Sequence, residues 1–429
     1  MARYCAYRGR QIRAVSSHHV QYSDDSGMKV LEVPAHLEEI ADGVLMERFV
    51  VRQGQLIDTA ARVEPSRLRV ALVGVYKERC GISTYAEALW PHLIAGVAEA
   101  RIFCEEGTVE RSPDWFADED LKKTMLVPSW KRGQPLMRLV NEIKQFDPDV
   151  VMIQHEYGLF PDARHWLAFL SALRDYKVFV TLHSVFHHKD KTICEAAVPN
   201  IIVHTELARD VLKNEKKVPG DVHVIPHGCH SFNSGEKYWN LYRSKHTFMQ
   251  FGFGFRYKGF ESCIRAVAEL RQTLPDVFFT ALFSESPHAK VQHDAYAQDL
   301  HELVDELGVQ ENVAIVRGFQ SDETLGSYLR TNQAAVFPYC AAPDHTVFGC
   351  SGAARIAMSH GIPIVASTEP HFHDLQGVAP RVSDVAGIVQ ALTGLFSSAD
   401  ERKAQLGRQA EFLRVNSWEN VARRHLELL

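Results

Sequence analysis

Two cations, Arg256 and Lys258, stand between a buried strand and an amphipathic helix in the stretch FGFGFRYKGFESCIRAV. The strand is expected to end at Gly252, and Gly259 is expected to open the helix. Unpaired N–H groups make a helix N-terminus partly positive, and arginine and lysine add full charges beside it. The pattern therefore predicts an anion site, with a solvated loop as the alternative.

A second stretch, FGCSGAARIAMSHGIPIVAS at residues 348–367, repeats this logic with small side chains instead of charge. Ser351, Gly352 and Ala353 would start a helix whose N–H groups an anion can approach closely. The alternative is a small-residue helix packed tightly on a sheet. Because two such helix starts are expected at strand ends in the same half of the chain, together they predict a bound diphosphate.

In the first half of the chain, polar residues follow the ends of apolar runs. Gly81 lies in the turn after the first strand, as a single glycine without the GxGxxG fingerprint of dinucleotide-binding domains. His155, Glu156 and Tyr157 follow one strand, and His183 follows the next. Strand-end residues of α/β proteins often bind ligands, so these four residues are candidates for a functional site. An ordinary turn at Gly81 and buried core histidines remain the alternatives.

Composition sets the class of protein. The chain has 429 residues, 46% hydrophobic and 23% charged, and a formal net charge of −6, which argues against coating nucleic acid through bulk charge. No apolar run is long enough to span a bilayer, and the 8 cysteines form no CxxC pair, so a cytoplasmic protein is expected. The 22 histidines show no HExxH spacing, and no metal site is expected.

Local exceptions to the acidic balance are two basic segments. An acid-free arm precedes Asp24, and a patch around Trp130 is rich in lysine and arginine. The patch is either a solvated surface or a contact for an anionic partner, such as a lipid headgroup, a phosphorylated sugar or nucleic acid. The arm is either a solvated segment or a contact for nucleic acid. The cations concerned are Arg3, Arg8, Arg10 and Arg13 in the arm, and Lys122, Lys123, Lys131, Arg132 and Arg138 in the patch.

The elements that must position these residues alternate between strand and helix from residue 67 onward, which predicts an α/β fold with parallel sheets covered on both faces. A polar stretch near 230–246 separates two such units, at 66–229 and 246–405, and an amphipathic helix at 406–429 closes the chain. Residues 1–65 form a separate small α/β extension, with a strand before Pro34 and a short helix after it.

At this point the chain resembles glycosyltransferase family 4. The similar segments occur in the family's order over residues 67–429: GISTYAEAL, DVVMIQHEYGLF, TLHS, VHTELARDVL, VIPHG, YKGFESCIRAV, VFPY, SGAARIAMSHGIPIVAS and SWENVARRHLELL. The resemblance implies the GT-B fold, two facing Rossmann-like doubly wound domains with a cleft between them. It also implies retaining transfer of a sugar from a nucleotide-diphosphate donor without a bound metal.

The resemblance assigns roles to the candidate residues. Lys258 and Arg256 would bind the donor diphosphate, and the N–H groups at Ser351, Gly352 and Ala353 would complete the cradle. Gly81 would face it from the first domain, and His183 would contact the donor sugar. The expected catalytic residues are thus His183, Arg256 and Lys258, and His155, Glu156 and Tyr157 are expected on the acceptor or sugar side.

One departure from the family pattern concerns its Glu-x7-Glu pair, which contacts the donor sugar and the ribose. Phe348 and Ile356 occupy those positions here, as in branches with a small-residue SSG variant. Asp344 or His345 could take the sugar contact. The resemblance also implies a hinge at Pro226-His227-Gly228 and a last helix, 406–429, that crosses back to the first domain.

These features lead to one main expectation and several open ones. We expect a metal-independent hexosyl- or pentosyltransferase with no tightly bound cofactor, using a UDP- or GDP-sugar. The acceptor is a glycan, a lipid-linked sugar, or a hydroxymethylated base in DNA that the arm would contact, because phage enzymes that glucosylate DNA also have the GT-B fold. Such a protein of phage origin would work in the host cytoplasm. A non-catalytic nucleotide-sugar-binding protein, a sugar-nucleotide epimerase and a homo-oligomer remain alternatives.

Overall fold

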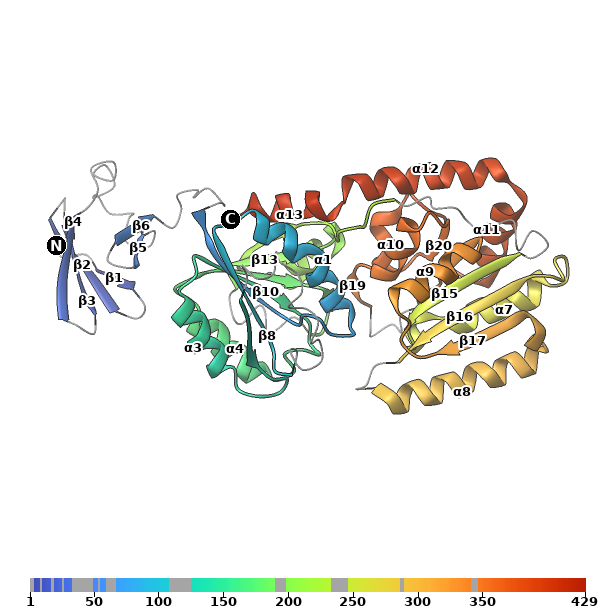
Figure 1. The fold of residues 1–429 in the computed structure, drawn as a ribbon, viewed down its shortest axis with the longest axis horizontal. Coiled ribbons are helices and arrows are strands. Elements are labelled where there is room, and N and C mark those ends of the chain that lie inside the picture. The colour runs from blue at the N-terminus through green and yellow to red at the C-terminus, as the bar shows by residue number, and fades with distance from the viewer. Residues whose placement is uncertain are drawn as a thin grey trace.

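The computed structural model describes six strands before residue 60 and then residues 67–107, 125–189, 198–232, 246–285, 289–340 and 346–429. Two α/β domains make up most of this part of the chain, and the helices at its C-terminus run along both (Figure 1).

The first domain contains a seven-stranded sheet in the order β14-β13-β11-β10-β7-β8-β9. Every neighbouring pair in it is parallel. The strands are β7 (Arg69–Val73), β8 (Glu99–Glu105), β9 (Met125–Trp130), β10 (Val150–His155), β11 (Lys177–Leu182), β13 (Asn200–Val203) and β14 (Asp221–Val224). The helices are α1 (Gly81–Ala95), α3 (Met137–Phe146), α4 (Ala163–Ala172) and α6 (Glu206–Asp210), which a π-helical turn (Val211–Glu215) continues. The strand order reverses between β7 and β10, which creates a crevice at their carboxyl ends.

The second domain contains a six-stranded parallel sheet in the order β17-β16-β15-β18-β20-β21. Its strands are β15 (Thr247–Phe253), β16 (Phe278–Ser284), β17 (Val313–Arg317), β18 (Ala334–Phe337), β20 (Ile364–Ser367) and β21 (Arg381–Val382). Its helices are α7 (Phe260–Leu270), α8 (Lys290–Leu307), α9 (Asp322–Thr331), α10 (Gly352–Ser359) and α11 (Val385–Ser397). Here the order reverses between β15 and β18. The prediction of two Rossmann-like doubly wound domains is confirmed.

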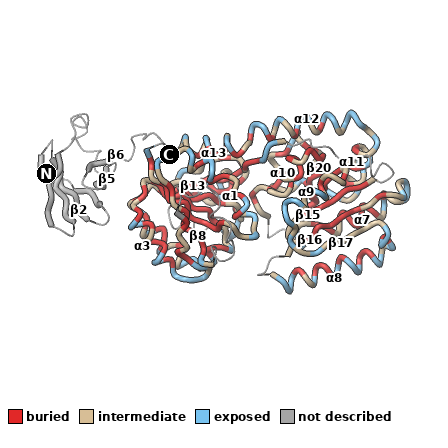
Figure 2. The backbone as a smooth tube through the Cα atoms, viewed as in Figure 1, coloured by how far each residue is buried: buried red, intermediate tan, exposed pale blue. Residues whose placement is uncertain are grey.

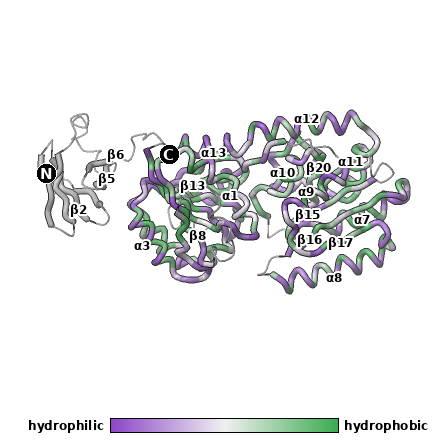
Figure 3. Tube along the Cα trace, in the orientation of Figure 1, coloured by the Kyte–Doolittle hydropathy of each residue, from purple (hydrophilic) through white to green (hydrophobic). Residues whose placement is uncertain are grey.

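Hydrophobic patterning explains these elements. Every residue of β10 is buried, as expected for a parallel strand covered on both faces. The buried residues of α7 include Phe260, Ile264 and Val267, at the three- and four-residue spacing that makes one apolar stripe. The buried segments in Figure 2 are largely the strands and the inner helix faces, and the same segments are strongly hydrophobic in Figure 3. These sheets are therefore rigid platforms for the loops at their carboxyl ends.

The C-terminal helices join the two domains. Helix α12 (Ala399–Val415) contacts α10 and α11, and α13 (Trp418–Leu426) packs against α1. The chain thus crosses back at Asn416 and Ser417, and the expected boundary at residue 406 lies inside α12. The outward crossing runs beside it, since the Cys229 N–H donates to the Asn416 carbonyl at 2.8 Å. Two adjacent segments therefore connect the domains.

The described part of residues 1–65 consists of strands. β1 (Tyr4–Tyr7), β2 (Arg10–Ser16), β3 (His19–Asp24) and β4 (Gly27–Glu32) form an antiparallel sheet, and β5 (Phe49–Arg52) pairs with β6 (Gln55–Asp58). β4 is the strand expected before Pro34, whereas the helix expected after it lies outside the described residues. Arg10 and Arg13 belong to β2, and Arg3 and Arg8 lie outside the described residues.

Candidate functional site

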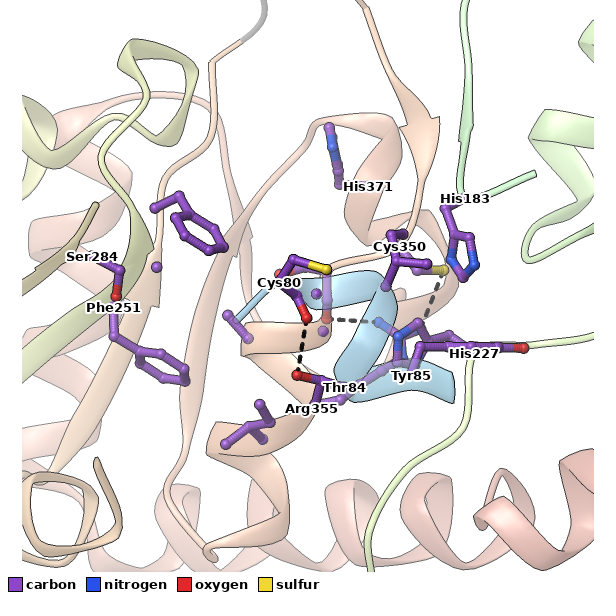
Figure 4. Close-up of a pocket in the computed structure, with 18 of the residues that line it drawn as sticks. Cys80, Thr84, Tyr85, His183, His227, Phe251, Ser284, Cys350, Arg355 and His371 are labelled. Carbon is purple, nitrogen blue, oxygen red and sulfur yellow. Dashed lines mark hydrogen bonds between the residues drawn. The ribbon is translucent and has the colours of Figure 1, made fainter. Parts of the chain in front are cut away.

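A cleft of about 370 Å³ lies between the carboxyl ends of the two sheets (Figure 4). This volume is in the range of small-molecule sites. One side of the cleft is lined by residues from α1, from the ends of β10 and β11, and from the crossing between the domains. The other side is lined by the end of β15, the turn before α7 and the starts of α9 and α10. The lining includes Cys80, Gly81, Tyr85, Glu156, His183, Ser184, His204, His227, Phe253, Lys258, Ser284, Phe319, Asp322, Tyr339, Ser351, Gly352, Ala353, Arg355, Ile356, His371 and Trp418.

The N-terminus of α10 opens into this cleft. Ser351 is the N-cap, and its Oγ accepts a hydrogen bond from the Ala354 N–H at 3.3 Å. Gly352 and Ala353 follow, and the first N–H groups of a helix have no acceptor within the helix. Both residues line the cleft. Their N–H groups can therefore bind an anion, as the sequence predicts.

Lys258 enters the same cleft from the turn before α7. That turn ends at Gly259, whose φ is +69° and whose missing side chain avoids the carbonyl of Pro338. The Lys258 amino group lies 3.9 Å from the ring centroid of Tyr339, and the Tyr339 hydroxyl lies 3.0 Å from Ser351 Oγ. Lys258 has no ion-pair partner among the described residues. Tyr339 thus links an available positive charge to the helix N-cap.

Arg256 takes a different direction from Lys258. Its guanidinium pairs with Asp299 on α8 and lies 5.1 Å from the ring centroid of Tyr296. The side chain is 65% exposed and does not line the cleft. A diphosphate contact by Arg256 stays a prediction from the sequence.

Gly81 begins α1 and faces the cleft from the first domain. The preceding residue, Cys80, is the N-cap, and its Sγ accepts a hydrogen bond from the Ser83 N–H at 3.4 Å. Burial raises the pKa of the Cys80 thiol to about 11, so the thiol stays protonated. A Cβ built on Gly81 would have no atom within 4 Å. The glycine therefore leaves open space in front of the helix.

His183 lies at the end of β11 and lines the cleft. Its Nε2 is 2.7 Å from Gln154 Oε1, and its Nδ1 is 3.3 Å from His204 Nε2. Burial, and then the neighbouring His204 and His155, hold the pKa of His183 well below its usual range. The imidazole is therefore neutral at physiological pH.

Of the three acceptor-side candidates, only Glu156 lines the cleft. Burial raises the pKa of its carboxyl, against a hydrogen bond from Ser184 that lowers it. His155 is 2% exposed and stacks on Phe160 with ring centroids 5.8 Å apart, and burial lowers its pKa to about 3. Tyr157 makes an edge contact with the His155 ring at 5.0 Å. The structure thus places these neighbours in different environments.

The two positions that carry glutamates in the family lie in different environments here. Phe348 and Gly349 form β19, which pairs antiparallel with β12 (Ser184–Val185) of the first domain. Phe348 is buried within the first domain's core, whereas Ile356 lines the cleft. Asp344 and His345, the expected substitutes, lie outside the described residues. At the position of the first glutamate of the family's pair, this chain therefore has a strand that pairs with the other domain.

Sequence reasoning missed several cleft residues. Arg355 is 2% exposed, donates to the Ser351 carbonyl at 3.1 Å, and forms an ion pair with Asp374. Tyr339 could have been found as the residue at the end of VFPY, just past a strand. Arg355 and Trp418 have no local sequence signal that marks them as cleft residues. Trp418, for example, reaches the cleft only because the chain crosses back to the first domain before α13.

The basic patch around Trp130 is largely neutralised where it is described. Arg132 pairs with Glu78 at 2.7 Å and with Glu105 at 3.0 Å, and Arg138 pairs with Glu106 at 2.7 Å. Lys122 and Lys123 lie outside the described residues. In the part of the chain that is described, no cluster of three or more His, Cys, Asp or Glu side chains could hold a metal ion, and no helix has the length and apolarity to cross a membrane.

Residues 80–231 match the model of Glycosyltransferase Family 4. The resemblance seen in the motifs is thereby confirmed for the first domain. No curated protein sequence matches the chain.

Solved structures show the same fold over both domains. Sucrose-phosphate synthase from Thermosynechococcus elongatus is 16% identical, with a TM-score of 0.66 over 84% of this chain and 98% of its own. HepE from Anabaena, in complex with UDP, is 13% identical, with a TM-score of 0.63 over 84% and 99%. A trehalose-6-phosphate structure from E. coli, bound with UDP-2-fluoro glucose, is 12% identical, with a TM-score of 0.62 over 84% and 98%. The two domains therefore have the GT-B fold, and the match to the family model lies in the first of them.

Proposed function

We propose that this protein transfers a sugar, with retention of configuration, from a nucleotide-diphosphate donor to an acceptor hydroxyl. The observation that carries the proposal is the meeting of Lys258 and the N-terminus of α10 in one interdomain cleft. A diphosphate between them would receive N–H donors from Gly352 and Ala353 and a positive charge from Lys258.

This arrangement suits the chemistry of glycosyl transfer. Breaking the glycosyl–phosphate bond develops positive charge on the anomeric carbon and negative charge on the leaving phosphate. Preorganised donors aimed at the developing negative charge are usually the largest catalytic contribution. Lys258 and the helix N–H groups supply that stabilisation without a metal ion.

The proposed route is front-face transfer, in which a donor phosphate oxygen takes the proton of the acceptor hydroxyl. Phe348 is buried and Ile356 is apolar, so neither position of the family's acid pair offers a nucleophile or base. Closure of the two domains would exclude water and limit hydrolysis of the donor.

The substrates are the less constrained part of the proposal. A UDP-sugar is the first choice, because solved relatives of this fold are described with UDP, UDP-glucose and UDP-2-fluoro glucose, and a GDP-sugar is the second. A glycan or lipid-linked sugar in the cytoplasm is the proposed acceptor. DNA contacted through residues 1–20 is the alternative, and a salt-sensitive DNA retention that disappears without those residues would favour it.

A donor screen tests the proposal. The protein is incubated with UDP- and GDP-sugars, and slow release of the nucleoside diphosphate is followed together with thermal shifts. Release shows transferase or hydrolase turnover, whereas a donor-dependent thermal shift without release shows a binding protein. Conversion of the donor to an epimer shows the epimerase instead. No release and no shift at millimolar donor would refute the assignment.

Lys258→Ala tests the cradle. Turnover should fall by on the order of a hundredfold or more, as when one charge-stabilising donor is lost from an active site. Lys290→Ala is the matched control, because that lysine is 70% exposed and pairs with Asp294 on α8, away from the cleft. Equal activity in the two variants would reject the cradle.

A further inference from the structure

In the wall of the cleft, a continuous row of polar groups runs from the buried Gln154 through the half-buried His183 and the buried His204 to a backbone carbonyl. Gln154 Oε1 lies 2.7 Å from His183 Nε2, and His183 Nδ1 lies 3.3 Å from His204 Nε2. His204 Nδ1 in turn lies 3.0 Å from the carbonyl oxygen of Ile225. Each ring nitrogen in the row therefore has one polar neighbour, and each contact needs one donor and one acceptor.

The Ile225 end sets the direction of the row. A carbonyl oxygen only accepts, so His204 Nδ1 must carry a hydrogen. Burial lowers the pKa of His204 to about 4, so the ring is neutral and its Nε2 carries a lone pair. The facing His183 Nδ1 must then donate. Through His204, the Ile225 carbonyl therefore requires that His183 carry its hydrogen on Nδ1.

The same reasoning continues to Gln154. The neutral His183 ring has its single hydrogen on Nδ1, which leaves Nε2 as an acceptor that needs a donor. The Gln154 amide supplies one when its N–H2 group faces His183. Amide oxygen and nitrogen have nearly the same shape, and the Gln154 Nε2 is otherwise buried without a partner. Each member of the row then donates one N–H hydrogen bond to the next: Gln154 donates to His183, His183 to His204, and His204 to the Ile225 carbonyl.

We propose that His204 is a positioning residue that holds His183 in its Nδ1–H tautomer. His183 can then bind a hydroxyl in the cleft only by accepting its hydrogen at Nε2, and that hydroxyl would take the place of the Gln154 amide. Tyr85 supports the arrangement, because its ring contacts both imidazoles, with centroids 4.7 Å from His183 and 5.3 Å from His204. The tautomer follows from the hydrogen-bond row alone, whereas a hydroxyl of a bound sugar rests on the proposed function.

The test is nitrogen NMR of the ligand-free protein at neutral pH. In protein labelled with ¹⁵N-histidine, two-bond proton–nitrogen correlations distinguish the two neutral tautomers. We expect His183 to show the Nδ1–H pattern in the wild type. His204→Leu removes the acceptor and should shift His183 to the Nε2–H tautomer or to a mixture. His204→Gln keeps an amide oxygen near His183 and should restore the Nδ1–H pattern.

A matched control excludes a general effect of losing a buried imidazole. His425 is also buried, donates through Nδ1 to the Val421 carbonyl at 2.8 Å, and makes no hydrogen bond to His183. His425→Leu should leave the His183 signals in place, and in the His204 variants the His425 signals report that the domain is still folded. An Nε2–H or mixed pattern in the wild type, or an unchanged pattern in His204→Leu, would overturn the proposal without touching the proposed function.

Kinetics give a second readout once a donor is known. His204→Leu should lower kcat by on the order of ten- to a hundredfold, by analogy with the loss of hydrogen-bond partners that orient metal-binding histidine rings. His204→Gln should recover most of that loss. A merely structural role predicts no such difference between the two variants at equal stability, and equal kcat values would contradict the positioning role.

Discussion

Gly349→Ala should loosen the strand pair that joins the two domains beside the proposed donor cradle. A Cβ at this position would lie 2.6 Å from the backbone oxygen of His183, closer than real Cβ atoms approach. The pair spans only Ser184–Val185 and Phe348–Gly349, so no neighbouring strand would hold it in register. Alanine must therefore push β19 away from β12.

The magnitude follows from that clash. Overpacking of a buried contact costs about 1–3 kcal/mol. If the cost falls on the pairing, its opening equilibrium rises by about 5- to 150-fold. Phe348 moves with the strand because it belongs to β19, and it is also part of the first domain's core. The start of α10, Gly352, lies only three residues beyond Gly349. Loosening of the pair should thus reach the diphosphate cradle.

Hydrogen exchange read by mass spectrometry measures the effect without a substrate. Peptides containing 184–185 and 348–349 should exchange faster in Gly349→Ala by the factor given, since exchange reports local opening. Gly407→Ala is the matched control, because a Cβ there has no atom within 4 Å and the site lies inside α12. It should leave both peptides unchanged. Unchanged exchange in Gly349→Ala as well would refute the reasoning.

Other predictions concern buried charge. Asp374→Leu leaves the Arg355 guanidinium buried without its counter-ion and should lower the free energy of unfolding, measured with urea, by about 3–5 kcal/mol. The double variant Arg355→Met with Asp374→Leu should recover most of that loss, and equal losses in the two variants would contradict a coupled pair. His155 has a pKa lowered to about 3 by burial, so its stabilising contribution is present above about pH 6.5 and is lost as the pH falls toward 3. His155→Phe should flatten the acid limb of the stability curve, and an unchanged limb would disprove this. Glu156 has a raised pKa, so its contribution is present below the unfolded pKa of about 4.3 and is lost as the pH rises through the folded value. Glu156→Gln should therefore raise stability at neutral pH relative to pH 4, and an equal change at both pH values would rule out this linkage.

Much of the fold could be predicted because its signals are local. The run of buried residues in β10 and the apolar stripe of α7 are readable from a few neighbouring residues, and their alternation leads to a doubly wound sheet. Lys258 and the small residues at 351–353 were also readable, because a cation or a small residue beside a helix start has a defined meaning.

The site beyond those residues could not be predicted. Arg256 and Lys258 are two positions apart and look equivalent in the sequence, yet Lys258 lines the cleft while Arg256 turns outward to Asp299. The turn geometry up to Gly259 decides which of them faces inward. His204 gave no signal either, because its importance depends on His183 and Ile225, about twenty residues away on either side.

The alternation of elements, the two domains and the helix starts that suit an anion all follow from local sequence signals, since each depends on residues close together in the chain. Which side chains meet in the cleft depends instead on the tertiary fold. The crossing of α13 brings Trp418 to the cleft, and the contact between domains pairs Gly349 with Ser184. These contacts join distant segments through shape and hydrogen-bond geometry, which no local pattern encodes.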